Sequence, residues 1–230
     1  MFPIPPVTLN LILACVALFC VDIIDRQGHV RLWLSFWPIG SGRFMPWQLL
    51  TYAFLHGNTT HLLMNLLGLW MFGAELEKLW GRRKFIIFVA VCAVTAAAAQ
   101  VVVAALMHGG PMIGISGVVY GLLLAYALAF PDREFELIGS LPILLLMMPS
   151  QTLNVLGLVL FVVINTNRQA LPIPMVFVRA LPMVLIFGGI ELFLGLFVHT
   201  GIAHFAHLGG MLGAWLMVKF WRSGGGRRRR

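Results

Sequence analysis

Four polar side chains stand near the starts of three apolar segments, and their types are those of hydrolytic chemistry. Ser116 opens "SGVVYGLLLAYALAF", His61 and Asn65 are one helical turn apart in "HLLMN", and His207 opens the last apolar stretch. A serine hydroxyl is a weak nucleophile that needs a neighbouring base, which His207 could provide. The negative charge of a tetrahedral intermediate needs donors placed in advance, and His61, Asn65 and the Ser116 N–H are the candidates.

Two further residues, Tyr120 and Glu191, bear on how the His207 side chain is positioned. Tyr120 follows Ser116 by four residues and so shares its helix face, and we expect its ring to pack on His207. An acidic third partner is not evident, because Glu191 alone among the acids lies within a later span, and a Ser–His dyad is the economical interpretation. Two interpretations of Glu191 remain. It could be a substrate-gate or proton-handling residue, or it could be a neutral, hydrogen-bonded carboxyl in the protein interior.

Other interpretations compete at single positions. Alone, Ser116 would be a helix N-cap in a glycine loop, and only the histidine elements outweigh that interpretation. His56 is expected to brace the first loop. His204 precedes His207 by three residues and could suggest a metal pair, but no carboxylate or thiolate is near it in the sequence. We therefore expect a packing or cavity-rim role for His204, and neither metal nor cofactor.

Composition places these residues in a membrane protein. The chain is 60% hydrophobic and 10% charged, whereas soluble domains average about 25% charged. Several segments must therefore face lipid, and long unbroken apolar runs exclude a β-barrel. The N-terminal segment has neither a basic region nor a small-residue cleavage site, so we expect it to be a first span. The cysteines all lie in expected spans and are interpreted as buried apolar residues: Cys15, Cys20 and Cys92.

The net charge of +8 is distributed as in a multi-pass membrane protein. Basic residues between and after the spans define the expected cytoplasmic side: Lys78, Arg82, Arg83, Lys84, Arg133, Lys219, Arg222 and Arg227 to Arg230. Only Arg26, Arg31 and Arg43 fall on the opposite side. The C-terminus is thus expected in the cytoplasm, with its basic tail against the lipid bilayer, and nucleic acid is not an expected partner.

Hydropathy predicts an all-α polytopic bundle of six spans with an extra apolar hairpin before the fifth. The expected spans are 8–24, 47 or 59 to 72, 85–107, 116–130, 178–201 and 202–222. An insert at about 140–180 precedes the fifth span. The fourth and the last spans must both descend, so an odd number of crossings lies between them. The rising fifth span is one crossing, so parity favours a hairpin for the insert. We expect its hinge at Pro149-Ser150-Gln151, with Arg168 and Arg179 on the cytoplasmic side.

The fourth span is too short to cross a bilayer alone. Fifteen residues give roughly 22 Å of helix against a hydrocarbon core of about 30 Å. If its lower end reaches the cytoplasmic interface, Ser116 starts below the outer surface and the preceding "HGGPMIGI" dips into the membrane. Irregular backbone at that depth must line a cavity or be packed in protein. A cavity with water, a serine and a histidine is what hydrolysis inside a membrane requires.

These elements resemble the rhomboid family of intramembrane serine proteases. The family pattern has G-x-S-G opening the fourth core helix, here "GISG", and H-x-x-x-x-H-x-x-x-N on the second, here "HGNTTHLLMN". Its third element, A-H-x-x-G on the sixth helix, is here "AHLGG". The match covers roughly residues 44–136 and 181–222, and three motifs on three spans are far more specific than one.

The resemblance implies roles for individual residues. It implies Ser116 as nucleophile, His207 as base, and an oxyanion hole from His61, Asn65 and the Ser116 N–H. It further implies substrate binding beside the hole at Gly114, stacking of Tyr120 on the base, and close approach of helices four and six at Gly117 and Gly210. Single-span membrane proteins, cut near the outer end of a helix, are the implied substrates. A bacterial cytoplasmic membrane is the implied location, and no cofactor is implied.

The chain also departs from the family pattern. Trp47-Gln48 stands where the family often has Trp-Arg, and Ala214 replaces a glycine one turn beyond Gly210. The insert has no counterpart in a compact six-span core, which leaves the arrangement of the fifth span, a suggested substrate gate, open. We expect one domain over 1–230 with a basic tail at 219–230.

Two other functions are weighed against proteolysis. A catalytically silent relative that only binds membrane segments would keep the fold, but it would not need the serine and histidine. A transporter or channel would need polar residues along the whole path, whereas spans four and six are apolar beyond the site.

Overall fold

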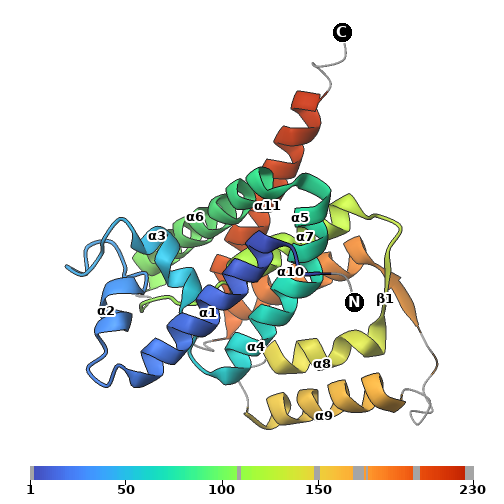
Figure 1. Ribbon diagram of the computed structural model, residues 1–230, viewed down its shortest axis with the longest axis horizontal. Coiled ribbons are helices and arrows are strands. Elements are labelled where there is room, and N and C mark those ends of the chain that lie inside the picture. Colours follow the sequence, from blue (N-terminus) through green and yellow to red (C-terminus); the bar gives the residue numbers. More distant parts are fainter. Residues whose placement is uncertain are drawn as a thin grey trace.

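The computed structural model describes residues 3–107, 110–147, 151–167, 174, 176–198 and 203–225, and it is built mostly of helices (Figure 1). The elements in chain order are α1 (Pro6–Ile24), α2 (His29–Leu34), α3 (Gln48–Thr51), η1 (Tyr52–Phe54), α4 (Thr59–Gly68), η2 (Leu69–Gly73), α5 (Ala74–Trp80), α6 (Arg82–Met107), α7 (Ser116–Ala129), β1 (Glu134–Glu136), α8 (Leu137–Met147), α9 (Gln151–Asn167), β2 (Phe177–Arg179), α10 (Ala180–Phe197) and α11 (His204–Gly225).

Among the described residues, three helices are long and apolar enough to cross a membrane, which makes the chain an integral membrane protein. They are α1, residues Arg82–Val103 of α6, and α10; α7 and Val155–Ile164 of α9 are shorter apolar helices. The count of six crossings stays a prediction.

The second expected span continues beyond its predicted end. Hydropathy placed that end at Phe72, but α4, the π-turn η2 and α5 form one helical run to Trp80. Residues 74–80 are mostly good helix formers, so the helix persists after the span becomes polar. It ends at Gly81, whose φ of 79° favours glycine.

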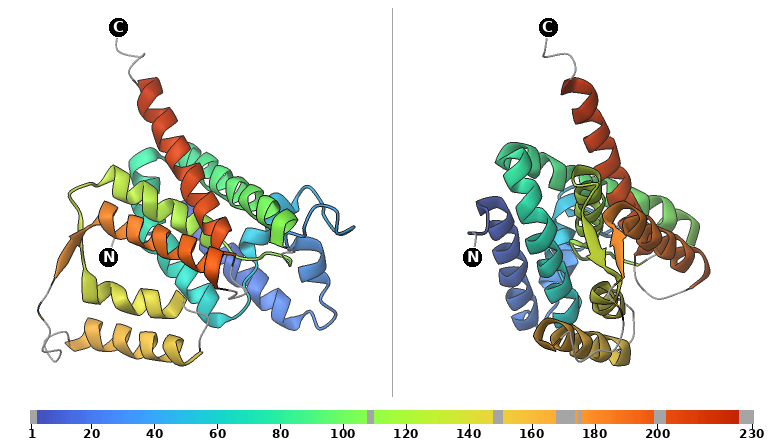
Figure 2. Two further views of the ribbon diagram at one scale, coloured as in Figure 1. Left: turned by 180° about the vertical axis from the view of Figure 1, so that it is seen from behind. Right: turned by 90° about the vertical axis from the view of Figure 1, so that its right-hand side faces the viewer.

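Helix α7 is the central element of the bundle. It is apolar on all sides, which is typical of a helix that other helices surround. Residues from Gly117 to Ala127 are almost all buried, and α7 contacts α4, α6, α10 and α11. Figure 2 shows α6, α10 and α11 running past it from different sides. The start of α7 is thus held from several directions.

The chain before α7 is irregular but packed. Phe36 and Met112 exchange backbone hydrogen bonds of 3.0 and 2.9 Å, and the N–H of Gly114 donates to the carbonyl of Tyr52 at 2.9 Å. Met112 and Ile115 are buried. The backbone groups of Met112 and the N–H of Gly114 therefore have protein partners, as irregular backbone within a membrane requires.

The insert forms two helices that lie side by side. Helices α8 and α9 pack against each other, and α8 also contacts α4 (Figures 1 and 2). The two-stranded sheet of β1 and β2 joins the ends of this insert, with Phe135 opposite Val178. The predicted hinge at Pro149-Ser150-Gln151 falls largely outside the described residues, as does Arg168, so the hairpin's crossing of the membrane stays a prediction.

Gln48, where the family often has arginine, organises the first loop. Its side chain is fully buried. Its carbonyl accepts from the N–H groups of Trp37 and Met45, and its amide donates to the carbonyls of Trp33 and Arg43. The amide group of Gln48 thus uses both its oxygen and its nitrogen to bind backbone groups of the first loop.

Candidate active site

Ser116 and His207 meet at the starts of two helices. Ser116 is the first residue of α7, and His207 lies in the first turn of α11. Nε2 of His207 is 2.8 Å from Oγ of Ser116. His207 is buried and Ser116 is half-buried, so the contact lies inside the bundle. At this distance the imidazole can accept the hydroxyl proton directly.

Glycines bring α7 and α11 close enough for this contact. A Cβ on Gly210 would overlap the carbonyl oxygen of Gly117, and one on Gly117 would lie 3.0 Å from the carbonyl oxygen of Ala206. Ala214, the departure one turn later, is itself fully buried. Close backbone approach at small residues is the usual way that helices pack within membranes. The crossing thereby sets the distance between hydroxyl and imidazole.

The ring of Tyr120 lies flat against His207. The two ring centroids are 4.4 Å apart and the planes differ by 10°. This contact comes from α7, one turn after Ser116, so one helix supplies both the hydroxyl and the surface on which the imidazole rests. Stacking restricts rotation of the imidazole about its side-chain bonds.

His61 and Asn65 come to the site from α4. The Asn58 side chain caps α4 by accepting from the N–H of His61 at 2.8 Å. The N–H of Gly57 donates to Nδ1 of His61 at 3.4 Å, which leaves the ring hydrogen on Nε2. Nδ2 of Asn65 is buried without a hydrogen-bond partner among the described residues. Two donors are thus available beside the hydroxyl.

Gly114 allows His61 to approach Ser116. Its φ of 112° lies where side chains are strained, and a Cβ there would be 2.6 Å from Cε1 of His61 and 3.8 Å from Oγ of Ser116. Any other residue at this position would therefore overlap the imidazole of His61 where it now lies.

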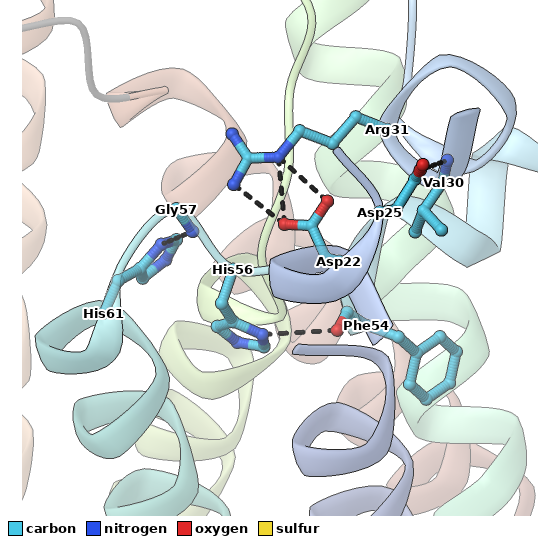
Figure 3. A network of polar contacts seen from close by, with 8 residues as sticks. All are labelled: Asp22, Asp25, Val30, Arg31, Phe54, His56, Gly57 and His61. Atoms are coloured by element: carbon cyan, nitrogen blue, oxygen red, sulfur yellow. Dashed lines mark hydrogen bonds and ion pairs between the residues drawn. The ribbon is translucent and has the colours of Figure 1, made fainter. Parts of the chain in front are cut away.

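His56 belongs to the support of the site rather than to its reacting groups. It is fully buried, Nδ1 is 3.3 Å from the carbonyl oxygen of Phe54, and its ring stands edge-on to His61 at 5.1 Å (Figure 3). The same view shows Arg31 bound by two nitrogens to the carboxylate of Asp22, with the shortest contact at 2.8 Å. This pair ties α2 to the end of α1 near His56.

The structure places Glu191 and His204 beside the base, whereas the sequence left Glu191 open as a gate or proton-handling residue and gave His204 a packing or cavity-rim role. Glu191 of α10 lies with Oε2 2.9 Å from Nδ1 of His207 and 2.6 Å from Nδ1 of His204. Its other oxygen accepts a hydrogen bond from the hydroxyl of Tyr120. The expectation that no carboxylate lies near His204 is wrong, as is the view that no acid stands beside the base. These two expectations were wrong because the contacts join helices that are distant in sequence. In the sequence, the only indication of the contact was one carboxylate in an apolar span.

A cavity of about 270 Å³ extends from Ser116 between α4, α7, α8 and α10. Its lining is Met64, Asn65, Leu67, Gly68, Met71, Phe72, Ser116, Val119, Tyr120, Leu123, Phe135, Glu136, Gly139, Ser140, Met183 and Phe187. Most of the lining is apolar, and its polar side chains include Asn65, Ser116, Tyr120, Glu136 and Ser140. Such a cavity suits an apolar chain segment whose polar backbone reaches the hydroxyl.

Comparison with known proteins agrees with this architecture. A family model described as "Rhomboid domain" matches residues 43–161. "Rhomboid protease GlpG" of Yersinia pestis (strain Pestoides F) is 33% identical over 138 residues, 60% of this chain and 48% of that protein. The proteins of the same name from Yersinia pseudotuberculosis serotype I (strain IP32953) and Yersinia enterocolitica serotype O:8 / biotype 1B (strain NCTC 13174 / 8081) are 34% and 32% identical over the same shares of each chain. The chain spans about half the length of the curated relatives it matches, and it belongs to the rhomboid family.

Proposed function

We propose that this chain is a serine endopeptidase that hydrolyses peptide bonds in or next to the transmembrane segments of single-span membrane proteins. The observation that supports it most directly is the 2.8 Å contact between Oγ of Ser116 and Nε2 of His207, within a bundle of apolar helices. The relatives described above are named as proteases, which supports the same class of activity.

The reaction has two balanced halves. Oγ of Ser116 attacks the peptide carbonyl carbon while Nε2 of His207 takes the hydroxyl proton, and this proton passes to the leaving amine as the C–N bond breaks. A water that gives its proton to His207 then attacks the ester carbonyl. Cleavage of the ester returns the proton to Ser116 and releases the new carboxyl end.

The negative charge of each tetrahedral intermediate falls on the former carbonyl oxygen. We assign its stabilisation to Nε2–H of His61, the amide of Asn65 and the N–H of Ser116, which also belongs to the positive end of α7. The Asn65 amide nitrogen, which has no hydrogen-bond partner among the described residues, supports this assignment, because a buried donor without an acceptor is costly unless a ligand supplies one.

The cavity beside Ser116 would hold the substrate. Its apolar wall between α4 and α10 suits the side chains of a membrane segment, and the bilayer delivers such segments. The proposed location is a bacterial cytoplasmic membrane. The proposed reaction needs no metal, so we expect cleavage to continue at an unchanged rate in EDTA.

A catalytically silent binder is the second candidate. It would use the same cavity, but it would not need the hydroxyl and imidazole in contact, so the Ser116–His207 distance favours hydrolysis.

The deciding experiment compares purified wild type with Ser116→Ala and His207→Ala. A labelled single-span substrate should be cleaved by the wild type only. A fluorophosphonate probe, which phosphonylates an activated serine oxygen with loss of fluoride, should label the wild type and not Ser116→Ala. Equal cleavage by all three proteins would overturn the proposal.

A further inference from the structure

We propose that Glu191 is a positioning residue for the base, so that the reacting pair is part of a buried array of Ser116, His207 and Glu191. This inference rests on the proposed function, because it concerns how His207 is kept ready to accept a proton. It changes the expected dyad into a three-residue chain drawn from α7, α11 and α10.

The carboxyl of Glu191 faces donors on both of its oxygens. Oε1 accepts from the hydroxyl of Tyr120, while Oε2 is 2.6 Å from Nδ1 of His204 and 2.9 Å from Nδ1 of His207. Glu191, His204 and His207 are 5%, 4% and 6% exposed. A buried carboxylate is tolerated only when it is paired and hydrogen-bonded, and this one has three donors around it.

The position of Glu191 decides which nitrogen of His207 carries hydrogen. Nε2 must be free of hydrogen to accept the proton of Ser116, so the neutral ring must be protonated at Nδ1. Glu191 is the acceptor beside Nδ1, although the N–H is not aligned well enough for a hydrogen bond at 2.9 Å. Such contacts commonly tighten only once the substrate is bound.

The same carboxylate stabilises the imidazolium that forms during reaction. When His207 takes the proton, a full positive charge appears in a water-poor interior, where an unpaired charge is costly. Oε2 of Glu191 is close enough to offset it at once. The negative charge is already present before reaction, so no group has to move into place.

Tyr120 and His204 hold Glu191 in turn. Tyr120 touches both partners, because its ring stacks on His207 and its hydroxyl binds Glu191. His204 lies one turn before His207 on the same helix and binds the same carboxylate oxygen. Among the residues that the structure describes, the titratable groups that face Glu191 from the packed helices are Tyr120, His204 and His207.

The test is Glu191→Gln, assayed with the labelled single-span substrate and with the fluorophosphonate probe. The amide keeps the size of the side chain but removes its charge. It presents an N–H₂ group toward Nδ1 of His207, which favours the tautomer with hydrogen on Nε2. We expect kcat to fall by about 100- to 10,000-fold, while KM stays within about twofold. Labelling of Ser116 should slow in parallel. Glu134→Gln, the same change at an exposed residue of β1, should behave as wild type.

Two further variants keep the test decisive if Glu191→Gln does not fold. Glu191→Asp retains the charge, but its side chain is one methylene shorter, so the carboxylate lies farther from His207. We expect kcat about tenfold lower than wild type. His204→Gln removes one support of the carboxylate and leaves the Ser116–His207 contact, so we expect a smaller loss than for Glu191→Gln.

The results separate this inference from the proposed function. If the wild type cleaves in a Ser116-dependent manner but Glu191→Asp and any folded Glu191→Gln keep wild-type kcat and labelling rate, Glu191 does not position the base. A fall in melting temperature with unchanged kcat would assign Glu191 a purely structural role. If the wild type itself neither cleaves nor labels, the protease proposal fails first.

Discussion

At the residue scale, Asn65 is the most direct test of the oxyanion site. Its buried amide nitrogen has no partner among the described residues and lies in the lining of the cavity. Removing one such donor from a tetrahedral intermediate costs about 10²–10³ in kcat. We therefore expect Asn65→Ala to lose about that factor with little change in KM, measured by cleavage of the labelled substrate.

The control for this prediction is Asn167→Ala, which removes the same side chain from an exposed position at the end of α9. It should leave kcat unchanged. An Asn65→Ala protein with wild-type kcat would remove this amide from the mechanism and leave His61 and the Ser116 N–H.

Tyr120 allows its two contacts to be separated. Tyr120→Phe keeps the ring that stacks on His207 and removes the hydroxyl that binds Glu191, whereas Tyr120→Leu removes both. We expect kcat to fall about tenfold for Phe and further for Leu, because hydrogen bonds to charged groups contribute about 1.5–3 kcal/mol. The rate of fluorophosphonate labelling should follow the same order. Equal rates for the two variants would mean that the hydroxyl alone matters.

Much of the residue-level site could be predicted from sequence. Ser116, His61, Asn65 and His207 were identified from their chemistry and their place near helix starts. Glu191 could not be assigned, because nothing in helical spacing tells which face of α10 meets α11. Its only signal was the cost of a carboxylate in an apolar span.

At the element scale, Glu77 joins the α4–α5 run to the start of α1. Its carboxylate accepts from the N–H groups of Val7 and Thr8 at 3.0 and 2.7 Å and from the hydroxyl of Thr8 at 2.8 Å. These N–H groups have no partner within α1, and the helix start favours an anion. We expect Glu77→Ala to lower the free energy of unfolding by about 2–4 kcal/mol.

Thermal unfolding in detergent is the measurement for Glu77, with exposed Glu134→Ala as the reference. The melting temperature should fall by several degrees for Glu77→Ala only. Equal melting temperatures for the two variants would show that the start of α1 frays without cost.

The crossing of α7 and α11 makes a second prediction at this scale. A methyl group at Gly210 would overlap the backbone of Gly117, whereas one at Gly224 on the same helix meets no atom of the described residues within 4 Å. Gly210→Ala should force the helices apart, with an overpacking cost of about 1–3 kcal/mol. Ser116 labelling should drop with it, and Gly224→Ala should match wild type. Retained labelling in Gly210→Ala would show that the crossing tolerates expansion.

Sequence predicted where the elements lie better than where they end. The hydropathy pattern and the positions of glycines predicted α1, α6, α7 and α10 to within a few residues. The π-turn at Leu69–Gly73 carries no composition signal, and hydropathy could not extend that helix to Trp80, because it reports contact with lipid and not helix formation. The pairing of β1 with β2 brings together residues more than 40 positions apart, which local patterns do not reveal.

At the scale of the whole molecule, one end of the bundle gathers the cations. Arg222 donates to the carbonyl of Leu128 at the end of α7, and Lys84 lies over the ring of Trp221. Trp80 packs edge-on against Trp221 at 5.0 Å. The ends of α5, α7 and α11 and the start of α6 are therefore neighbours, and α11 extends beyond them (Figure 1). Aromatic rings and cations at one level are typical of a cytoplasmic membrane interface.

This arrangement predicts the orientation of the chain, which fusion proteins can measure in bacterial cells. A fluorescent protein fused after Arg230 should fluoresce and alkaline phosphatase at the same place should be inactive, since both results report the cytoplasm. Alkaline phosphatase fused after Gly110, in the segment before α7 at the opposite end, should be active. We expect this orientation because moving basic clusters across the membrane is unfavourable, so they stay on the cytoplasmic side. Active phosphatase after Arg230 would show that the bundle has the opposite orientation. Ser116 would then lie near the cytoplasmic side, and substrates would be cut at their inner ends.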